Sequence, residues 1–203
     1  MKYQAYLTLF SFIAFFLNSC SDKNEPHPIE SSSEFINLEV GNYWTYDWYI
    51  ENNEGSMKYH LSDSVYISSK ETLDGKVVFK KVGTFLGHNQ IQYIFDSLNT
   101  LYSFPDRTVI FSLEPTTFES YLANDLLIEF QLEELIQDID VPIGSYECLN
   151  FKGEVNHPDY GTLYNNNYYS RDIGLVKMTT HYYHNQQLLE MILTGYGSTN
   201  KPG

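Results

Sequence analysis

Hydrophobic and polar residues alternate along the segment "YWTYDWYIE", which spans residues 43–51. Trp44, Tyr46, Trp48 and Ile50 fall on one parity, and the other parity carries most of the polar and charged residues. Successive side chains of a strand point to opposite faces of the sheet. The period of two therefore predicts a strand with one buried face.

The next segment, "MKYHLSDSVYI" at 57–67, repeats the alternation after the turn sequence "NNEGS". The residues on its apolar side are Met57, Tyr59, Leu61, Val65 and Ile67. Two alternating strands joined by a short glycine-containing turn are expected to pair as a hairpin. A further hairpin turn is predicted at Asp74 and Gly75.

Short alternating segments separated by turns continue to the end of the chain. Strands are expected at 76–85, 91–96, 101–104, 108–113, 126–134, 145–155, 163–170, 175–183 and 188–196. Thr116 and Glu119 have the spacing of a capping box, so a short helical turn is expected at 116–122. Few helices remain to cover a sheet, so its apolar face must close on itself or curl around something. The pattern predicts an all-β fold with minor α content, built as a single antiparallel meander sheet.

The first 19 residues follow a different pattern. Lys2 gives a short positive start, residues 5–17 are almost wholly apolar, and the small Ser19 precedes Cys20. This three-part arrangement is typical of a secretory signal peptide. A membrane-spanning helix needs about 20 apolar residues, and this run is shorter. Residues 1–19 are therefore expected to be removed.

Residues 17–20, "LNSC", resemble the lipobox of bacterial lipoproteins. The resemblance implies that Cys20 becomes the first mature residue and is joined to the membrane through diacylglycerol and acyl chains. Several chains on one cysteine hold a protein durably, whereas one holds it only marginally. Ser21 after the cysteine favours the outer membrane, and Asp22 with Glu25 resembles the acidic export signal of Bacteroidota surface lipoproteins. Both the periplasmic and the cell-surface face stay open, and the alternative is an ordinary signal peptide cleaved near a cysteine.

Residues 21–34 are rich in Ser, Pro and acidic residues and lack apolar periodicity, which predicts a flexible linker. Together with the cysteine that the lipobox resemblance implies to be lipidated, this segment spans residues 20–34. Residues 35–203 are expected to form one antiparallel β domain, because the chain is 42% hydrophobic and only 19% charged. The 26 acidic side chains against 12 basic ones give a net charge of −14. This charge disfavours binding to nucleic acid and to anionic headgroups.

Three segments carry a family resemblance: "LEVGNYWTY" at 38–46, "VPIGSYECLNF" at 141–151 and "YYSRDIGLVK" at 168–177. Their order and spacing resemble the uncharacterised β-rich lipoprotein domains of Bacteroidota over most of residues 38–196. Such domains are similar to half-barrel or lipocalin-like folds, in which a sheet curves around a cavity. The resemblance therefore implies a half-barrel or lipocalin-like barrel, and it supplies no catalytic residues.

Candidate chemistry is sparse. The chain lacks the nucleophile-elbow, zincin, paired-cysteine, phosphate-loop and dinucleotide motifs, so neither a cofactor nor an enzymatic activity is expected. His181 and His184 are the best metal candidates, but no third ligand is evident, and they are interpreted as exposed hairpin residues. Asp138 and Asp140 share a parity like the acid pair of a glycosidase, but are interpreted as solvated loop residues. Cys148 is interpreted as a small apolar residue in a strand and not as a nucleophile.

The chain is 16% aromatic, with 18 tyrosines and the alternating series Trp44, Tyr46 and Trp48. These three residues are candidates for binding a ligand, and the competing interpretation places them in the core as β-forming side chains. The first function hypothesis is a non-catalytic binding or accessory module whose curved sheet holds an apolar ligand such as a lipid. It predicts a cavity of about a few hundred cubic ångströms. The alternative is a cell-surface module that binds glycan or protein through exposed aromatic residues over a filled core, and a hydrolase ranks third.

Overall fold

The structure is a computed structural model that describes residues 31–121, 126–182 and 185–199. Within these ranges the chain forms one short helix, α1 (Ser32–Phe35), and twelve strands. The strands are β1 (Asn42–Glu51), β2 (Met57–Leu73), β3 (Lys76–Phe85), β4 (His88–Ser97), β5 (Thr100–Phe104), β6 (Val109–Ser112), β7 (Phe118–Tyr121), β8 (Leu127–Val141), β9 (Gly144–His157), β10 (Gly161–Ser170), β11 (Gly174–His181) and β12 (Leu188–Ser198). No helix in the described ranges has the length and apolarity that crossing a membrane requires.

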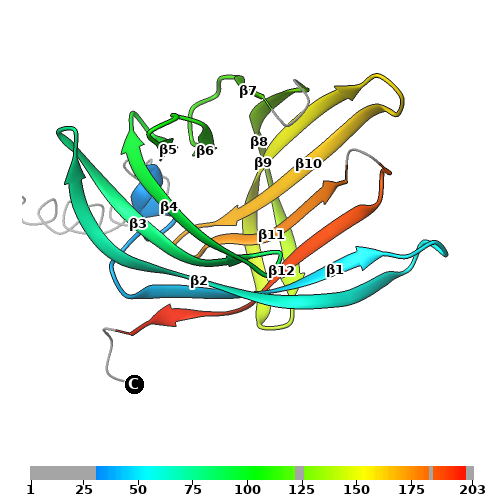
Figure 1. Cartoon of the computed structure of the whole chain (residues 1–203), viewed down its shortest axis with the longest axis horizontal. Coiled ribbons are helices and arrows are strands. Elements are labelled where there is room, and N and C mark those ends of the chain that lie inside the picture. The colour runs from blue at the N-terminus through cyan, green and yellow to red at the C-terminus, as the bar shows by residue number, and fades with distance from the viewer. Residues whose placement is uncertain (1–30, 122–125, 183–184, 200–203) are drawn as a thin grey trace, which may run out of the picture.

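All twelve strands lie in one antiparallel sheet in the order β6-β5-β4-β3-β2-β1-β12-β11-β10-β9-β8-β7. Strands that follow one another in sequence pair, except that β6 and β7 form the two edges of the sheet, and β1 pairs with β12 in its middle. The sheet curls until its two halves face each other and nearly closes into a barrel (Figure 1). The predicted all-β meander curled into a half-barrel or lipocalin-like barrel is therefore confirmed.

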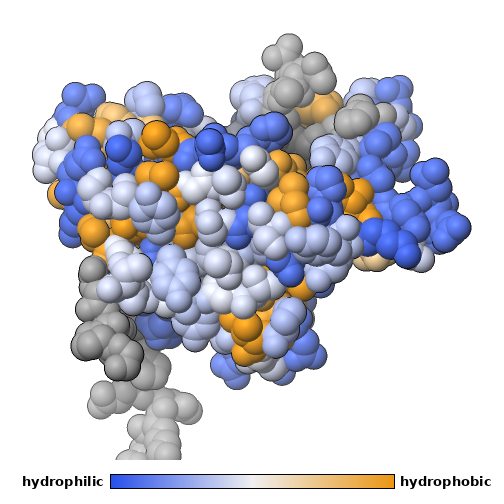
Figure 2. All heavy atoms as spheres, turned by 60° about the horizontal axis from the view of Figure 1, so that its bottom comes forward, coloured by the Kyte–Doolittle hydropathy of each residue, from blue (hydrophilic) through white to orange (hydrophobic). Residues whose placement is uncertain are grey.

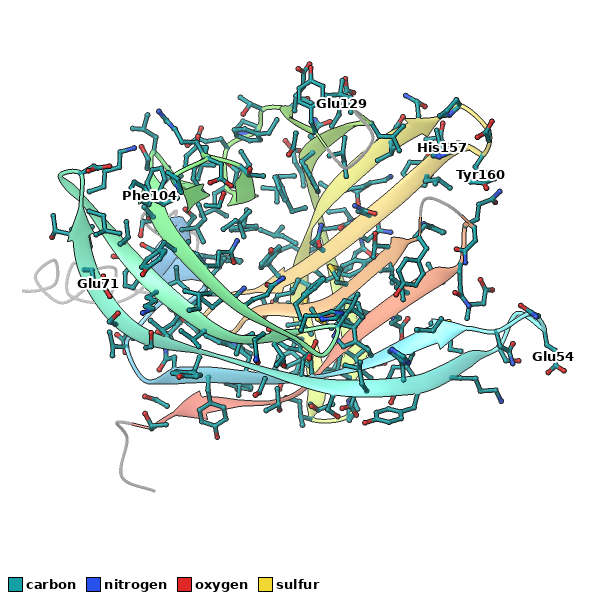
Figure 3. The ribbon with its side chains drawn as sticks, in the orientation of Figure 1. Glu54, Glu71, Phe104, Glu129, His157 and Tyr160 are labelled. Carbon is teal, nitrogen blue, oxygen red and sulfur yellow. The ribbon has the colours of Figure 1, made fainter. Side chains whose placement is uncertain are left out.

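Aromatic side chains connect the edge strand β6 with inner strands of the opposite half of the sheet. Phe111 lies on the edge strand β6 and is fully buried. Its ring contacts those of Phe151 on β9 and Tyr169 on β10, with centroids 5.9 and 4.4 Å away. Phe35, at the end of α1, stacks on the same ring at 5.4 Å. Figure 3 shows side chains from both halves of the sheet filling much of the space between them, while the labelled Glu54 lies at a hairpin tip.

Helix α1 begins within the segment that was predicted to be a linker. Residues 32–34 are helical, so the boundary predicted at residue 35 falls inside α1. A capping box between Ser31 and Glu34 starts the helix. The Asp96 carboxylate on β4 then accepts hydrogen bonds from the Ser32 and Ser33 hydroxyls, both at 2.8 Å. Residues 1–30, including Cys20, lie outside the described ranges, so the predicted signal peptide and lipidation stay predictions.

The helical turn expected at 116–122 is wrong for the residues that the structure describes. Phe118–Tyr121 form strand β7, which pairs with β8 from Phe118 opposite Phe130 to Tyr121 opposite Leu127. The adjacent strand satisfies the backbone groups of this segment, so tertiary pairing prevails over the local capping signal. Strand β8 also runs on to Val141, so Asp138 and Asp140 lie in a strand and not in a loop.

Candidate functional site

A cavity of about 120 Å³ lies among the inward-facing side chains of the barrel. Strands from both halves of the sheet border it, and Ile36 and Leu38, just after α1, contribute further apolar side chains. The lining is mainly aliphatic and aromatic, with Met178 and Met191 from β11 and β12. A concave, mostly apolar site with few polar groups is typical of small-molecule binding.

Two of the three residues in the series Trp44, Tyr46 and Trp48 border this cavity. Trp44 and Tyr46 are each 6% exposed and border the cavity. Trp48 is fully buried, and its ring packs edge-on against Phe85 with centroids 5.0 Å apart. Trp44 and Tyr46 therefore line the cavity, whereas Trp48 belongs to the core beside them.

The polar atoms of the lining rings are already bonded to the barrel wall. Trp44 Nε1 donates to the carbonyl oxygen of Ile173. The Tyr46 hydroxyl donates to the Leu175 carbonyl at 3.1 Å, and the Tyr169 hydroxyl donates to the Ile110 carbonyl. Burial raises the pKa of both phenols well above the ordinary value. These residues consequently present ring faces to the cavity and remain neutral.

Asp63 is a buried carboxylate at the cavity that the sequence patterns did not single out. It is 4% exposed, and it accepts hydrogen bonds from Trp48 Nε1 at 2.7 Å and from the Gly87 amide at 3.1 Å. Two donors satisfy both carboxylate oxygens and hold the Trp48 ring in place. Its signal in the sequence is a charged residue on the parity of Leu61 and Val65.

Lys81 on β3 is the second charged residue of the lining and was also missed from the sequence. It is half-buried, and burial lowers the pKa of its amine. Across residues 31–121, 126–182 and 185–199, no hydrogen bond or ion pair joins Lys81 to another side chain. Its sequence signal is the same as that of Asp63, because Lys81 shares its parity with Phe79 and Phe85.

The cavity is smaller than the sequence-based hypothesis required. A cavity of about 150 Å³ is known to hold benzene, so about 120 Å³ suits a hydrocarbon group of up to about six carbon atoms. A diacyl lipid does not fit this space. The lipid example of the first hypothesis is therefore replaced by a smaller apolar ligand.

The remaining sequence candidates lie away from the cavity. Asp138 and Asp140 are exposed on β8. Cys148 is 1% exposed, and burial together with the Asp138 charge raises its pKa to about 12. His181 ends β11, and its buried Nδ1 has no hydrogen-bond partner in the described ranges, whereas His184 lies outside them. No group of three potential metal ligands was found among the described residues.

The outer face of the β1–β2 hairpin carries two cross-strand tyrosine pairs. Tyr43 lies opposite Tyr66, and both are exposed. Tyr49 lies opposite Tyr59 with their rings edge-on at 6.0 Å, because the register shifts after Trp48. The prediction that Tyr59 faces the core is therefore wrong. The register shift turns Tyr59 to the outer face, where it is 59% exposed. On the face that Figure 2 presents, hydrophobic side chains form separate groups among polar ones.

No family model matches the chain, and no curated protein matches it. Four chains in solved structures are similar to it, and two of them are the following. One is described as an exported protein with a YmcC-like fold from Bacteroides fragilis, with 13% identity and a TM-score of 0.48 over 79% of this chain and 97% of that chain. The other is described as a lipoprotein from Parabacteroides distasonis, with 13% identity and a TM-score of 0.37 over 79% of this chain and 96% of that chain. At these levels of similarity neither structure defines a family or a function for this chain.

Proposed function

We propose that the chain is an outer-membrane lipoprotein, anchored through Cys20, whose barrel is a non-catalytic module that binds a small apolar ligand. The anchor rests on the sequence alone, because a positive start, an apolar run and the "LNSC" segment occur together at residues 2–20. The observation that supports binding is the cavity, since a largely filled barrel interior retains about 120 Å³ bordered by Trp44 and Tyr46.

The methionines allow a direct test of binding in the cavity. The chain has four, of which Met178 and Met191 border the cavity, whereas Met57 lies at the start of β2. The protein is labelled with ¹³C at the methionine methyl groups and titrated with 1-hexanol. We expect the Met178 and Met191 signals to shift together with saturation, while the Met57 signal stays in place.

A matched pair of variants separates the cavity from the surface. Val65→Phe adds volume at a residue that lines the cavity, whereas Val77→Phe adds the same ring at a site that is 49% exposed. The first variant should lose the hexanol-induced shifts, and the second should keep them. If no probe of this size shifts the two methionine signals in the unchanged protein, the cavity is not a binding site.

The anchor has a separate test in the membrane fraction of the native host. Intact mass spectrometry of the mature protein should show an N-terminal Cys20 carrying diacylglycerol and acyl chains. Cys20→Ala should release the protein from the outer-membrane fraction, and Cys148→Ala serves as the matched cysteine control. Digestion of whole cells with a protease then decides between the periplasmic and the cell-surface face. An unmodified mature terminus would contradict the anchor.

A second candidate function has its own observation, the exposed tyrosine pairs on β1 and β2. Between them, Asp47 accepts a hydrogen bond from Ser62 on the same outer face. Flat aromatic faces beside polar groups suit the two sides of a sugar ring or a protein surface. Binding to a glycan array that Tyr59→Ala and Tyr66→Ala abolish, and that Val65→Phe leaves unchanged, would favour this function. Unaltered array binding in both tyrosine variants would exclude this face.

A further inference from the structure

Lys81 is the one lining residue in the described ranges that places a cationic side chain at the cavity. It lies on β3 between Phe79 and Phe85, which share its parity. Phe79 belongs to the core, and Phe85 is 39% exposed but packs edge-on against the buried Trp48 and borders the cavity. The neighbouring Lys80 has the opposite parity, and its amine lies 5.9 Å from the Tyr93 ring centre. Lys80 therefore has an aromatic partner, whereas the amine of Lys81 borders an apolar space.

The Lys81 ammonium group has no ion-pair partner within 4 Å in the described part of the chain, although the Asp63 carboxylate lines the same cavity. The nearest candidate in the lining is Asp63, but both of its oxygens accept hydrogen bonds from Trp48 Nε1 and the Gly87 amide. No ion pair of up to 4 Å joins Asp63 to Lys81 in the described part of the chain. A charge in an apolar environment is costly unless it is paired. The cavity therefore has an unused charge-bearing donor.

Most other side-chain donors of the lining are not free to bind a ligand. The Trp44, Tyr46 and Tyr169 donors are bonded to backbone carbonyls. Thr84 borders the cavity as well, and its hydroxyl oxygen accepts from the Ser64 amide, which leaves the hydroxyl proton available to an acceptor. Lys81 and the Thr84 hydroxyl therefore supply free hydrogen-bond donors at the cavity, and such donors suit an anionic acceptor.

From this arrangement we propose that the cavity selects an apolar carboxylate of about six carbon atoms, whose carboxylate group pairs with Lys81. The hydrocarbon part contacts Trp44, Tyr46 and the two methionines. This inference rests on the proposed function of the cavity and specifies the chemical class of its ligand. The volume of the cavity limits the number of carbon atoms in the ligand, because about 120 Å³ accommodates a hydrocarbon group comparable to benzene.

The test compares two probes that differ only in the head group, hexanoate and 1-hexanol. The full chain carries Cys20→Ser, so that no acyl chain of its own competes for the cavity, and binding is followed through the Met178 and Met191 methyl signals at pH 6.5. A charge-assisted pair is expected to make hexanoate bind at least about tenfold more tightly than hexanol. Lys81→Met replaces the amine by an apolar group of similar length, and Lys80→Met is the matched control on the outer face.

In Lys81→Met the preference should disappear, so that hexanol binds as in the unchanged protein and hexanoate binds no better than hexanol. Continued hexanol binding also shows that this variant is folded. In Lys80→Met the preference should be retained. The inference is overturned if hexanoate has no advantage in the unchanged protein, or if Lys81→Met keeps that advantage, and in both cases hexanol binding leaves the proposed function intact. If neither probe shifts the methionine signals, the inference and the proposed function both fail.

Discussion

Replacement of Asp63 tests whether a buried carboxylate organises the wall of the cavity. Asp63→Ala removes the acceptor for Trp48 Nε1 and for the Gly87 amide, which leaves the buried Trp48 donor without a partner, whereas the amide of the exposed Gly87 can turn to water. Asp63→Asn keeps one carbonyl oxygen and exchanges the other for an amide group, so only one donor retains its acceptor. Ser62→Ala, on the exposed side of the same strand, is the matched control.

The magnitude follows from the two lost bonds. Leaving the buried Trp48 donor unsatisfied costs about 1–3 kcal/mol, and losing the part-buried bond to the Gly87 amide costs about 0.5–1.5 kcal/mol more. Removing a desolvated carboxylate recovers part of this. We therefore expect Asp63→Ala to lower the free energy of unfolding by about 2–4 kcal/mol and Asp63→Asn by about half as much. A domain stable by about 5–15 kcal/mol would still fold. Ser62→Ala should change stability by no more than about 0.5 kcal/mol.

The assay is urea unfolding at neutral pH, followed by the fluorescence of the two tryptophans, Trp44 and Trp48. The order of midpoints should be unchanged protein, then Asp63→Asn, then Asp63→Ala. The reasoning is refuted if Asp63→Ala lies within about 1 kcal/mol of the unchanged protein, because the two donors would then have found other partners. A loss in Ser62→Ala as large as that in Asp63→Ala would refute it equally.

Three further predictions concern other parts of the fold. Cys148, with its pKa raised to about 12 by burial, should not react with a thiol reagent at pH 8 until urea unfolds the protein; rapid labelling of the native state would contradict its burial. Because burial raises the phenol pKa values of Tyr46 and Tyr169, stability should be complete below about pH 10 and fall above it, where only the unfolded phenols ionise. Tyr169→Phe should flatten that loss in alkaline melting curves. Asp96→Ala should free α1, seen as faster hydrogen exchange at residues 32–38, whereas unchanged exchange would show that Phe35 packing alone holds the helix.

The strands were predictable because one face of the sheet is buried and the other is largely solvated. Strand β3 coincides with the predicted segment 76–85, and the predicted turn at Asp74 and Gly75 joins it to β2. Helix α1 was missed although its capping box is present in the sequence at Ser31 and Glu34. Its docking depends on Asp96, which is distant along the chain and has no local signal.

The site was only half predictable. Parity identified Trp44 and Tyr46 as inward-facing, but it does not tell whether opposite walls meet or leave space. That depends on residues such as Ile36 and Tyr169, which come together only in the folded barrel. The charged Lys81 and Asp63 were overlooked because the alternation was judged by its apolar members. A charged side chain on the apolar parity of a strand is the signal that identifies both.

The pairing of β1 with β12 also determines the order in which the sheet can form during synthesis. Strands β1 to β6 form one local meander, and β7 to β12 form another, so each half can pair its strands as it leaves the ribosome. Asn42 opposite Ser198 and Ile50 opposite Leu189 can meet only when nearly the whole chain has emerged. Until then β1 presents an unpaired edge, which is a surface that other chains can join. The barrel therefore needs protection from aggregation until its last strand arrives.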